Sequence, residues 1–242
     1  SKDEVFLKRD PENRYTVSTN EFVKIPGSPM AFWVSEEIRS VFNKATLIGA
    51  VAEVRQGLAT GENNRFLRAW HEISIERIGF CYGSVAEAEA SGQKWFPYNK
   101  GGDFRKWYGN QYFLVNWECD GKEIRAFGSE AGGKPRSRAQ STQFYFRPSL
   151  SWSKVSSSGF ALRSFPPGFI FDVAGCSIFG EKLTPILGCM NSAIMTQAVN
   201  SLSPTLNFEV GQVQDFPFIE PTTERVPELM DVLVGMARSD WN

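Results

Sequence analysis

The chain is poor in histidine, in closely spaced cysteines and in long apolar runs, and these absences exclude several classes of protein. A single histidine, His71, and four scattered cysteines without a Cys-x-x-Cys pair cannot form a zinc site of the usual spacing. No apolar run approaches the roughly 20 residues that cross a bilayer. The polar opening SKDEVFLKRDPENRY predicts no signal peptide. We therefore expect a cytoplasmic protein with free thiols, no metal and no membrane contact.

Catalytic motifs are also missing. There is no glycine-rich cofactor turn after a first strand, and no Asn-Pro-Pro-Tyr-like loop of the kind that grips a flipped adenine. Pro166-Pro167 follows Phe165 rather than an Asn or Asp, so it cannot supply an amide acceptor. No PD…ExK nuclease arrangement stands out, and the lone His71 argues against acid–base work by histidine. We predict no catalytic residues and no bound cofactor in this chain.

The charge is distributed unevenly along the chain. Between Lys94 and Arg163 there are 12 Lys/Arg and 5 Asp/Glu, a balance of +7. The rest has 14 basic and 22 acidic residues, or −8, which gives the net charge of −1. A basic middle within an acidic frame is a candidate footprint for nucleic acid, unless the two signs interleave and cancel in space.

Apolar periodicity and turn signals predict an α+β fold, a β-rich domain with flanking helices and a C-terminal helical tail. Residues 1–25 favour strands, Phe32–Phe42 favours a helix, and Asp120-Gly121 is typical of a hairpin turn before a strand at Lys122–Phe127. Further strands are expected at Ala50–Arg55, Gln111–Trp117, Phe144–Phe146, Leu150–Ser153, Ala161–Phe165 and Phe169–Val173.

The C-terminal part changes character. Leu183–Leu202 and Glu224–Trp241 have the spacing of amphipathic helices, and Pro204–Phe218 is expected to be an extended connector. We divide the chain into lead-in strands and a helix over residues 1–48, a main domain over 49–219 and a terminal helix over 220–242.

Three segments have the residues that a DNA-contacting surface needs. Gly57–Arg68 is a Gly- and Asn-rich loop, Lys94–Asn110 interleaves cations with aromatics around Gly101-Gly102, and Lys134–Arg138 is a basic loop within the polar stretch Ser129–Thr142. The alternatives are a structural strand connection for the first segment and core aromatics for the second. The candidate contact residues are Thr60, Asn63, Asn64, Arg65, Arg68, Lys100, Arg105, Lys106, Tyr108, Asn110, Lys134, Arg136, Arg138 and Lys154.

Taken in order, three stretches resemble the C-terminal target-recognition region of PglX-like adenine-specific DNA methyltransferases of BREX phage defence. More distantly, they resemble type IIG restriction–modification enzymes. The stretches are GLATGENNRFLRAW, then WFPYNKGGDFRKWYGN with the following VNWECDG, then ILGCMNSAIMTQAVNSLSPTLNFEVGQVQDFPFI. Together they span about residues 50–220. The second stretch is the most specific to the PglX-like group.

This resemblance implies a domain that reads a short asymmetric sequence in double-stranded DNA. It implies that the chain is a segment of a longer protein, whose missing catalytic domain would bind S-adenosylmethionine and flip the adenine. A phage DNA-mimic protein would fit the same basic face. The alternative is a protein-interaction module that docks other subunits of the defence system, and salt dependence of binding separates the two.

Overall fold

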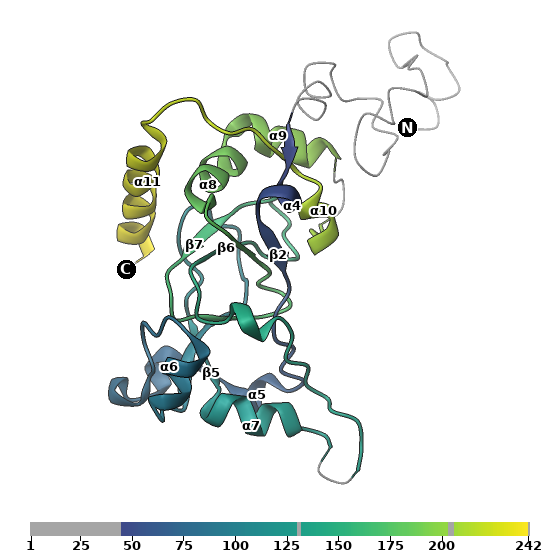
Figure 1. Ribbon diagram of the computed structural model, residues 1–242, viewed down its shortest axis with the longest axis vertical. Helices are drawn as coiled ribbons and strands as arrows, with labels where there is room; N and C mark the ends of the chain where they lie inside the picture. The colour runs from purple at the N-terminus through teal and green to yellow at the C-terminus, as the bar shows by residue number, and fades with distance from the viewer. Residues whose placement is uncertain (1–44, 130–131, 203–205, 242) are drawn as a thin grey trace, which may run out of the picture.

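The computed structural model describes residues 45–129, 132–202 and 206–241. The strands and the helix predicted within residues 1–44 lie outside this described part. Two four-stranded sheets and the helices packed against them make up most of it, so the predicted α+β class is confirmed. In Figure 1 the two sheets lie one above the other, and they meet where the Asn99 amide of one sheet donates to the Ser151 hydroxyl of the other at 2.6 Å.

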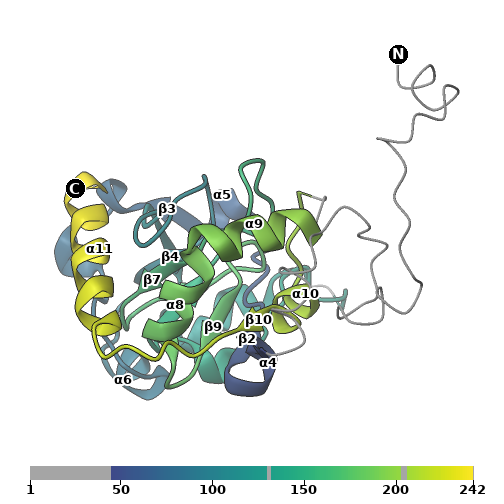
Figure 2. The same ribbon diagram turned by 90° about the horizontal axis from the view of Figure 1, so that it is seen from above.

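The first sheet is antiparallel and supports the C-terminal helices. Its strands, in spatial order, are β2 (Glu53–Arg55), β9 (Ser177–Phe179), β6 (Ser149–Ser151) and β7 (Arg163–Phe165). Figure 2 shows α8 (Leu183–Asn191) and α9 (Ala193–Leu202) lying across these strands, with α11 (Val226–Trp241) on one side and α10 (Val210–Gln214) on the other. In chain order the helices around this sheet are α4 (Ile48–Val51), α8 (Leu183–Asn191), α9 (Ala193–Leu202), α10 (Val210–Gln214) and α11 (Val226–Trp241).

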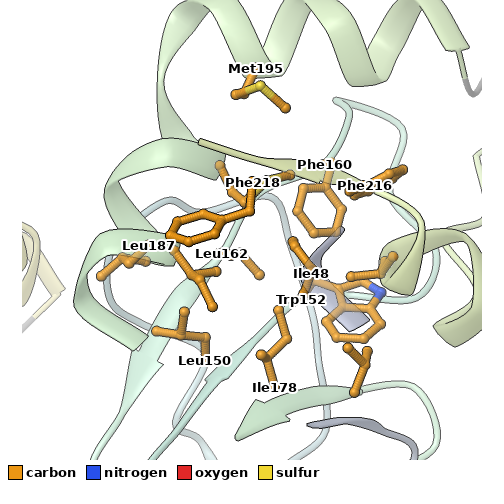
Figure 3. Packing of buried hydrophobic residues seen from close by; sticks show 14 of the residues in the cluster. Ile48, Leu150, Trp152, Phe160, Leu162, Ile178, Leu187, Met195, Phe216 and Phe218 are labelled. Atoms are coloured by element: carbon orange, nitrogen blue, oxygen red, sulfur yellow. The ribbon is translucent and has the colours of Figure 1, made fainter. Parts of the chain in front are cut away.

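An aromatic core joins this sheet to its helices. Trp152 is fully buried, and its indole N–H donates to the Phe208 carbonyl at 2.9 Å, so the polar atom of this large ring is satisfied. Phe160 packs edge-on against Phe216, with ring centroids 5.1 Å apart (Figure 3). It also packs edge-on against Phe208, at 5.3 Å. Because Phe160 precedes β7 while the other two rings follow α9, their packing fixes the C-terminal segments onto the sheet.

The second sheet carries the candidate site. Its spatial order is β3 (Leu67–Ala69), β5 (Phe113–Asn116), β4 (Trp95–Asn99) and β8 (Ile170–Phe171), antiparallel except for the parallel pair β4–β8. The short helices beside it are α5 (Asn63–Phe66), α6 (Val85–Ala90) and α7 (Glu118–Ala126), and the single-turn 3-10 helices are η2 (Trp70–Glu72), η3 (Ile75–Arg77) and η4 (Thr142–Phe144). A second aromatic core lies beneath it, with Phe96 and Phe146 in edge contact at 5.4 Å.

Several predicted strands are confirmed in place and shorter than expected: β2, β5, β7 and β8 fall within their predicted ranges, and β6 overlaps its predicted range but begins one residue earlier, at Ser149. The strand β9 was not predicted. The hairpin at Asp120-Gly121 was wrong, because the chain enters α7 there. Cys119, Asp120 and Gly121 all have positive φ, and a Cβ at Gly121 would lie 2.6 Å from the Trp117 ring. The Asp-Gly pair does mark left-handed backbone, but it folds the chain into a helix.

Phe144–Phe146 does not form the predicted strand. Its residues belong to η4 and to a turn in which Phe146 has a φ of 68°. The aromatic run is instead explained by burial, since both phenylalanines lie in the second core.

The helix predicted at Leu183–Leu202 is two helices. At Ser192 the backbone turns extended, and the Ser192 hydroxyl accepts the Met195 N–H at 3.2 Å, so it caps α9. The connector at Pro204–Phe218 was only partly correct, because it contains α10 and ends in the short strand β10 (Pro217–Phe218), which pairs with β1 (Thr46–Leu47). The terminal helix is confirmed as α11.

All four cysteines are free thiols. Within the described ranges, no cluster of three or more His, Cys, Asp or Glu side chains is arranged to hold a metal ion. In that same part of the chain, no helix combines the length and apolarity that a membrane span requires.

Candidate nucleic-acid interface

The Gly57–Arg68 loop is held against the second sheet at its start. The Leu58 N–H donates to the Phe171 carbonyl at 2.8 Å, and a Cβ at Gly57 would lie 1.9 Å from that same oxygen, so only glycine fits. Further along, the Thr60 hydroxyl donates to the Asn63 side-chain oxygen at 2.6 Å. Thr60 is buried, so the structure places it inside the loop and leaves Asn63 at the surface.

The Lys134–Arg138 loop lies directly beside the first loop. Ala59 and Arg138 form an isolated antiparallel bridge, with N···O distances of 2.9 and 2.8 Å in the two directions. At Gly61, which has a φ of 73°, an added Cβ would lie 2.7 Å from the Arg136 carbonyl oxygen. Two of the three predicted contact segments, which are far apart in the sequence, are therefore held side by side by backbone hydrogen bonds.

These loops lie at the end of the molecule opposite α8 and α9, where the first loop contains α5 and the second follows α7 (Figure 1). A pocket of about 440 Å³ opens at the first of these loops. Four predicted residues, Asn63, Asn64, Arg68 and Lys100, line it together with the unpredicted Phe113. We call this the polar pocket. Amide and guanidinium groups in such a recess can donate to base edges or to phosphate oxygens.

Lys100 is fixed at this pocket by a buried acid. Its ammonium lies 2.6 Å from Asp172 Oδ2, and the Tyr98 hydroxyl donates to the same oxygen at 2.6 Å. Asp172 is buried, whereas Lys100 retains about a quarter of its side-chain exposure at 26%. Burial, followed by the negative charge of Asp172, raises the pKa of Tyr98 well above its ordinary value. Lys100 thus neutralises a buried charge and still presents its stem to the pocket.

Among the described residues, the cations of the basic loop have no acidic partner. Lys134, Arg136 and Arg138 are all exposed, and no ion pair with them occurs among the described residues. The Arg136 guanidinium stacks over the ring of Phe127, 5.1 Å from its centroid. These three side chains therefore reach solvent with their charge uncompensated, as a phosphate-contacting loop requires.

Arg65 differs, because it is paired. It contacts Glu123 at 2.9 Å, and both side chains are more than two-fifths exposed, at 43% and 46%. An ion pair this exposed contributes little to stability, so Arg65 can exchange its acid for a phosphate at small cost.

The Lys94–Asn110 segment is not one contact loop. Its first part is strand β4, whose five residues are all buried, so the alternative interpretation of core aromatics is correct for Trp95, Phe96 and Tyr98. Asn110 is buried as well, and its amide donates to the Asp103 carbonyl at 2.8 Å.

The rest of that segment packs against the C-terminal helices. The Lys106 ammonium donates to the Asn191 carbonyl at 2.8 Å and to the Thr196 hydroxyl at 3.0 Å, and partial burial lowers its pKa. Arg105 stacks over Trp241 at 4.7 Å, and Arg238 lies over the Tyr108 ring at 5.7 Å. These side chains thus have partners within the chain, and the structure does not bring them to the Gly57–Arg68 and Lys134–Arg138 loops.

Lys154 also lies apart from the loops. It pairs with Glu209, just before α10, at 2.9 Å, and its backbone N–H donates to the Ala174 carbonyl at 2.9 Å.

Sequence reasoning missed a set of exposed aromatics next to the polar pocket. Trp70, Phe80, Tyr112 and Phe113 line a second recess together with Trp241 of α11. The available signal was the run Gln111-Tyr112-Phe113 at the start of a predicted strand, where alternation requires one of two neighbouring rings to leave the core.

No protein-family model matches the chain. Two curated proteins do. The chain is 36% identical over 249 residues to the adenine-specific methyltransferase PglX of Lacticaseibacillus casei strain Zhang, a match that covers 100% of this chain and 20% of that protein. The predicted resemblance to PglX-like methyltransferases is confirmed. The adenine-specific methyltransferase BrxX of Escherichia coli O9:H4 strain HS is 35% identical over 229 residues, covering 92% of this chain and 17% of BrxX. The chain spans about a fifth of the length of these relatives.

Proposed function

We propose that this chain is the sequence-reading domain of an adenine-specific DNA methyltransferase of phage defence, and that it binds double-stranded DNA. The observation that carries the proposal is the backbone bridge between Ala59 and Arg138, because it unites an Asn-rich loop and an uncompensated basic loop on one surface. The match to two adenine-specific methyltransferases supports DNA as the partner. Methyl transfer and S-adenosylmethionine binding are assigned to the part of the parent protein outside this chain.

The two loops have different roles in this proposal. Lys134 and Arg138 contact phosphates and position the duplex, which contributes affinity without sequence information. Asn63, Asn64 and Arg68 read base edges, since amide and guanidinium groups can hydrogen-bond to them in the major groove. Arg68 does so with the guanidinium nitrogens other than Nη1, which donates to the Asn64 and Leu67 carbonyls at 2.8 and 2.6 Å. An acidic phage protein that mimics DNA would compete for the basic loop.

The test is a salt titration of binding to a random pool of duplex DNA, with the bound fraction sequenced. The wild-type chain should bind with steep salt dependence and enrich one motif. The double variant Lys134→Glu/Arg138→Glu should weaken binding about 10- to 100-fold and lower the log–log salt slope by roughly 2, close to 0.9 for each phosphate that is no longer neutralised. Lys182→Glu/Arg225→Glu is a matched control. It changes the charge equally beside α8 and α11, at the other end of the molecule, and should leave binding nearly unchanged.

Asn64→Ala should relax the enriched motif at one position and leave the salt slope intact. Equal weakening in the loop variant and its control would contradict the assigned surface.

A second candidate function is docking of another defence subunit. It is favoured by three exposed apolar residues of α11, namely Leu229, Val232 and Met236, which recur at helical spacing on one face. Absence of duplex binding even at low salt would favour this candidate over DNA recognition.

A further inference from the structure

A second recess, the aromatic pocket, lies beside the proposed DNA surface. It encloses about 580 Å³, within the range of pockets that hold small ligands. One wall is β5 and the segment before it, and another is the last turn of α11, which contributes Arg238 and Trp241.

The rings of this pocket are exposed to a degree that folding does not explain. Trp70 is 57%, Phe80 47% and Tyr112 51% exposed. The ring centroids of Tyr112 and Trp241 are 4.5 Å apart. The backbone N–H of Trp70 donates to the backbone carbonyl of Tyr112 at 2.9 Å. Large exposed rings gathered in one recess mark a binding site more often than a structural feature.

The wall of the pocket also has an unsatisfied amide. The Tyr108 hydroxyl donates to Gln111 Oε1 at 3.0 Å, while the buried Gln111 Nε2 has no partner among the described residues. If the amide is turned over, Nε2 meets the tyrosine oxygen and Oε1 is left alone, so one polar atom stays unpaired in either orientation. The Arg238 guanidinium, at the same pocket, adds hydrogen-bond donors.

The aromatic pocket is adjacent to the polar pocket. Phe113 lines both, and Trp70 follows directly after β3, the strand that presents Arg68 to the polar pocket. DNA bound at the polar pocket therefore lies close to the aromatic rings.

We propose that the aromatic pocket binds a nucleobase that has left the base stack of DNA, an inference that rests on the proposed function. Stacking on Trp70 and Tyr112 replaces the base–base stacking of the duplex, as in proteins that hold unpaired bases on aromatic side chains. The exposed Arg238 guanidinium supplies hydrogen-bond donors for the edge of the base. This combination of planar rings with a guanidinium suits a base better than a purely apolar side chain of a protein partner.

The test compares a fully paired duplex with the same duplex carrying one bulged adenine, both at low salt. An unpaired base costs less to unstack, so a pocket that binds it increases affinity for the bulged duplex. The wild-type chain should bind the bulged duplex about tenfold more tightly. Trp70→Ala and Tyr112→Ala should each reduce that ratio to about one, with binding of the paired duplex unchanged. Phe104→Ala, an exposed aromatic outside the pocket, is the matched control and should retain the full ratio.

The outcomes separate the two proposals. Equal affinity of the wild-type chain for both duplexes overturns the base pocket and leaves DNA recognition standing. A ratio that also falls to one in Phe104→Ala overturns it too, since the effect would not be specific to the pocket. Failure to bind either duplex overturns both. In that case, the pocket would be assigned to a protein partner if a proline-rich peptide protects the fluorescence of Trp70 and Trp241 from quenching.

Discussion

The buried Arg163 allows a test of how charge is handled inside this fold. Its side chain is 1% exposed, and its only described hydrogen bond runs from Nη2 to the Ser153 hydroxyl oxygen at 3.1 Å, with Nε unpaired. Burial lowers the pKa of Arg163 from its ordinary value to about 10. A shift of this size corresponds to about 3 kcal/mol, which at neutral pH is a cost of keeping the buried charge.

Arg163→Met should therefore stabilise the protein. Methionine keeps the apolar stem and removes the charge, and Ser153 is not orphaned because its hydroxyl donates to the Gly102 carbonyl at 2.6 Å. We expect a gain of about 1 to 3 kcal/mol in the free energy of unfolding, measured by urea denaturation at neutral pH.

The pH dependence follows from the same shift. A depressed pKa in the folded state means that the unfolded chain binds the proton more tightly between about pH 10 and pH 12.5. Wild-type stability should thus rise relative to Arg163→Met as the pH increases through this window, and the difference between them should be full at neutral pH. Tyrosine ionisation affects both proteins equally and cancels in the comparison.

Lys100→Met is the opposite case, because Lys100 has a partner. Its removal leaves Asp172 buried without its cation, and we expect a destabilisation of about 1 to 2 kcal/mol after allowing for the exposure of Lys100.

For Arg163→Met, a destabilisation of more than about 1 kcal/mol would contradict the expected gain, since it would show that the guanidinium makes net favourable interactions.

Three further predictions use glycines and thiols. Gly57→Ala should prevent folding, seen as loss of a cooperative urea transition, because its Cβ would overlap the Phe171 carbonyl. Gly235→Ala, in an exposed position of α11 with nothing within 4 Å, should raise the free energy of unfolding by about 0.5 to 1 kcal/mol; a decrease would contradict the open surroundings of this glycine. Exposed Cys81 should be alkylated in the native state, whereas Cys176, whose pKa burial raises to about 12, should react only on unfolding, as mass spectrometry of the labelled thiols would show.

Local signals predicted much of the fold. Apolar periodicity located β5 and α11, and turn residues located the polar stretch before η4. What local signals could not supply was the partner of each ring or charge. The aromatics of β4 have the composition of a contact loop, and only the strands on both sides of β4 show that they are core.

The same limit applies to the site. Asn63, Arg136 and Arg138 were predicted from their own segments, yet their proximity depends on a backbone bridge across nearly eighty residues of sequence, since Ala59 pairs with Arg138. Arg105 and Lys106 show the converse. They belong to the basic stretch, but they contact the C-terminal helices, because their partners Trp241 and Asn191 lie much later in the chain. Composition indicates which chemistry is available, and tertiary packing decides where it is used.

The pairing of β1 with β10 has a consequence for how such a unit can be inherited. Thr46 lies opposite Phe218, so the path into the two sheets and the path out of them run side by side. The segment between the paired strands therefore begins and ends at one place in the fold. Helix α11 follows β10 and still packs on α8, which belongs to that segment, so a unit that is transferred intact has to include α11 as well.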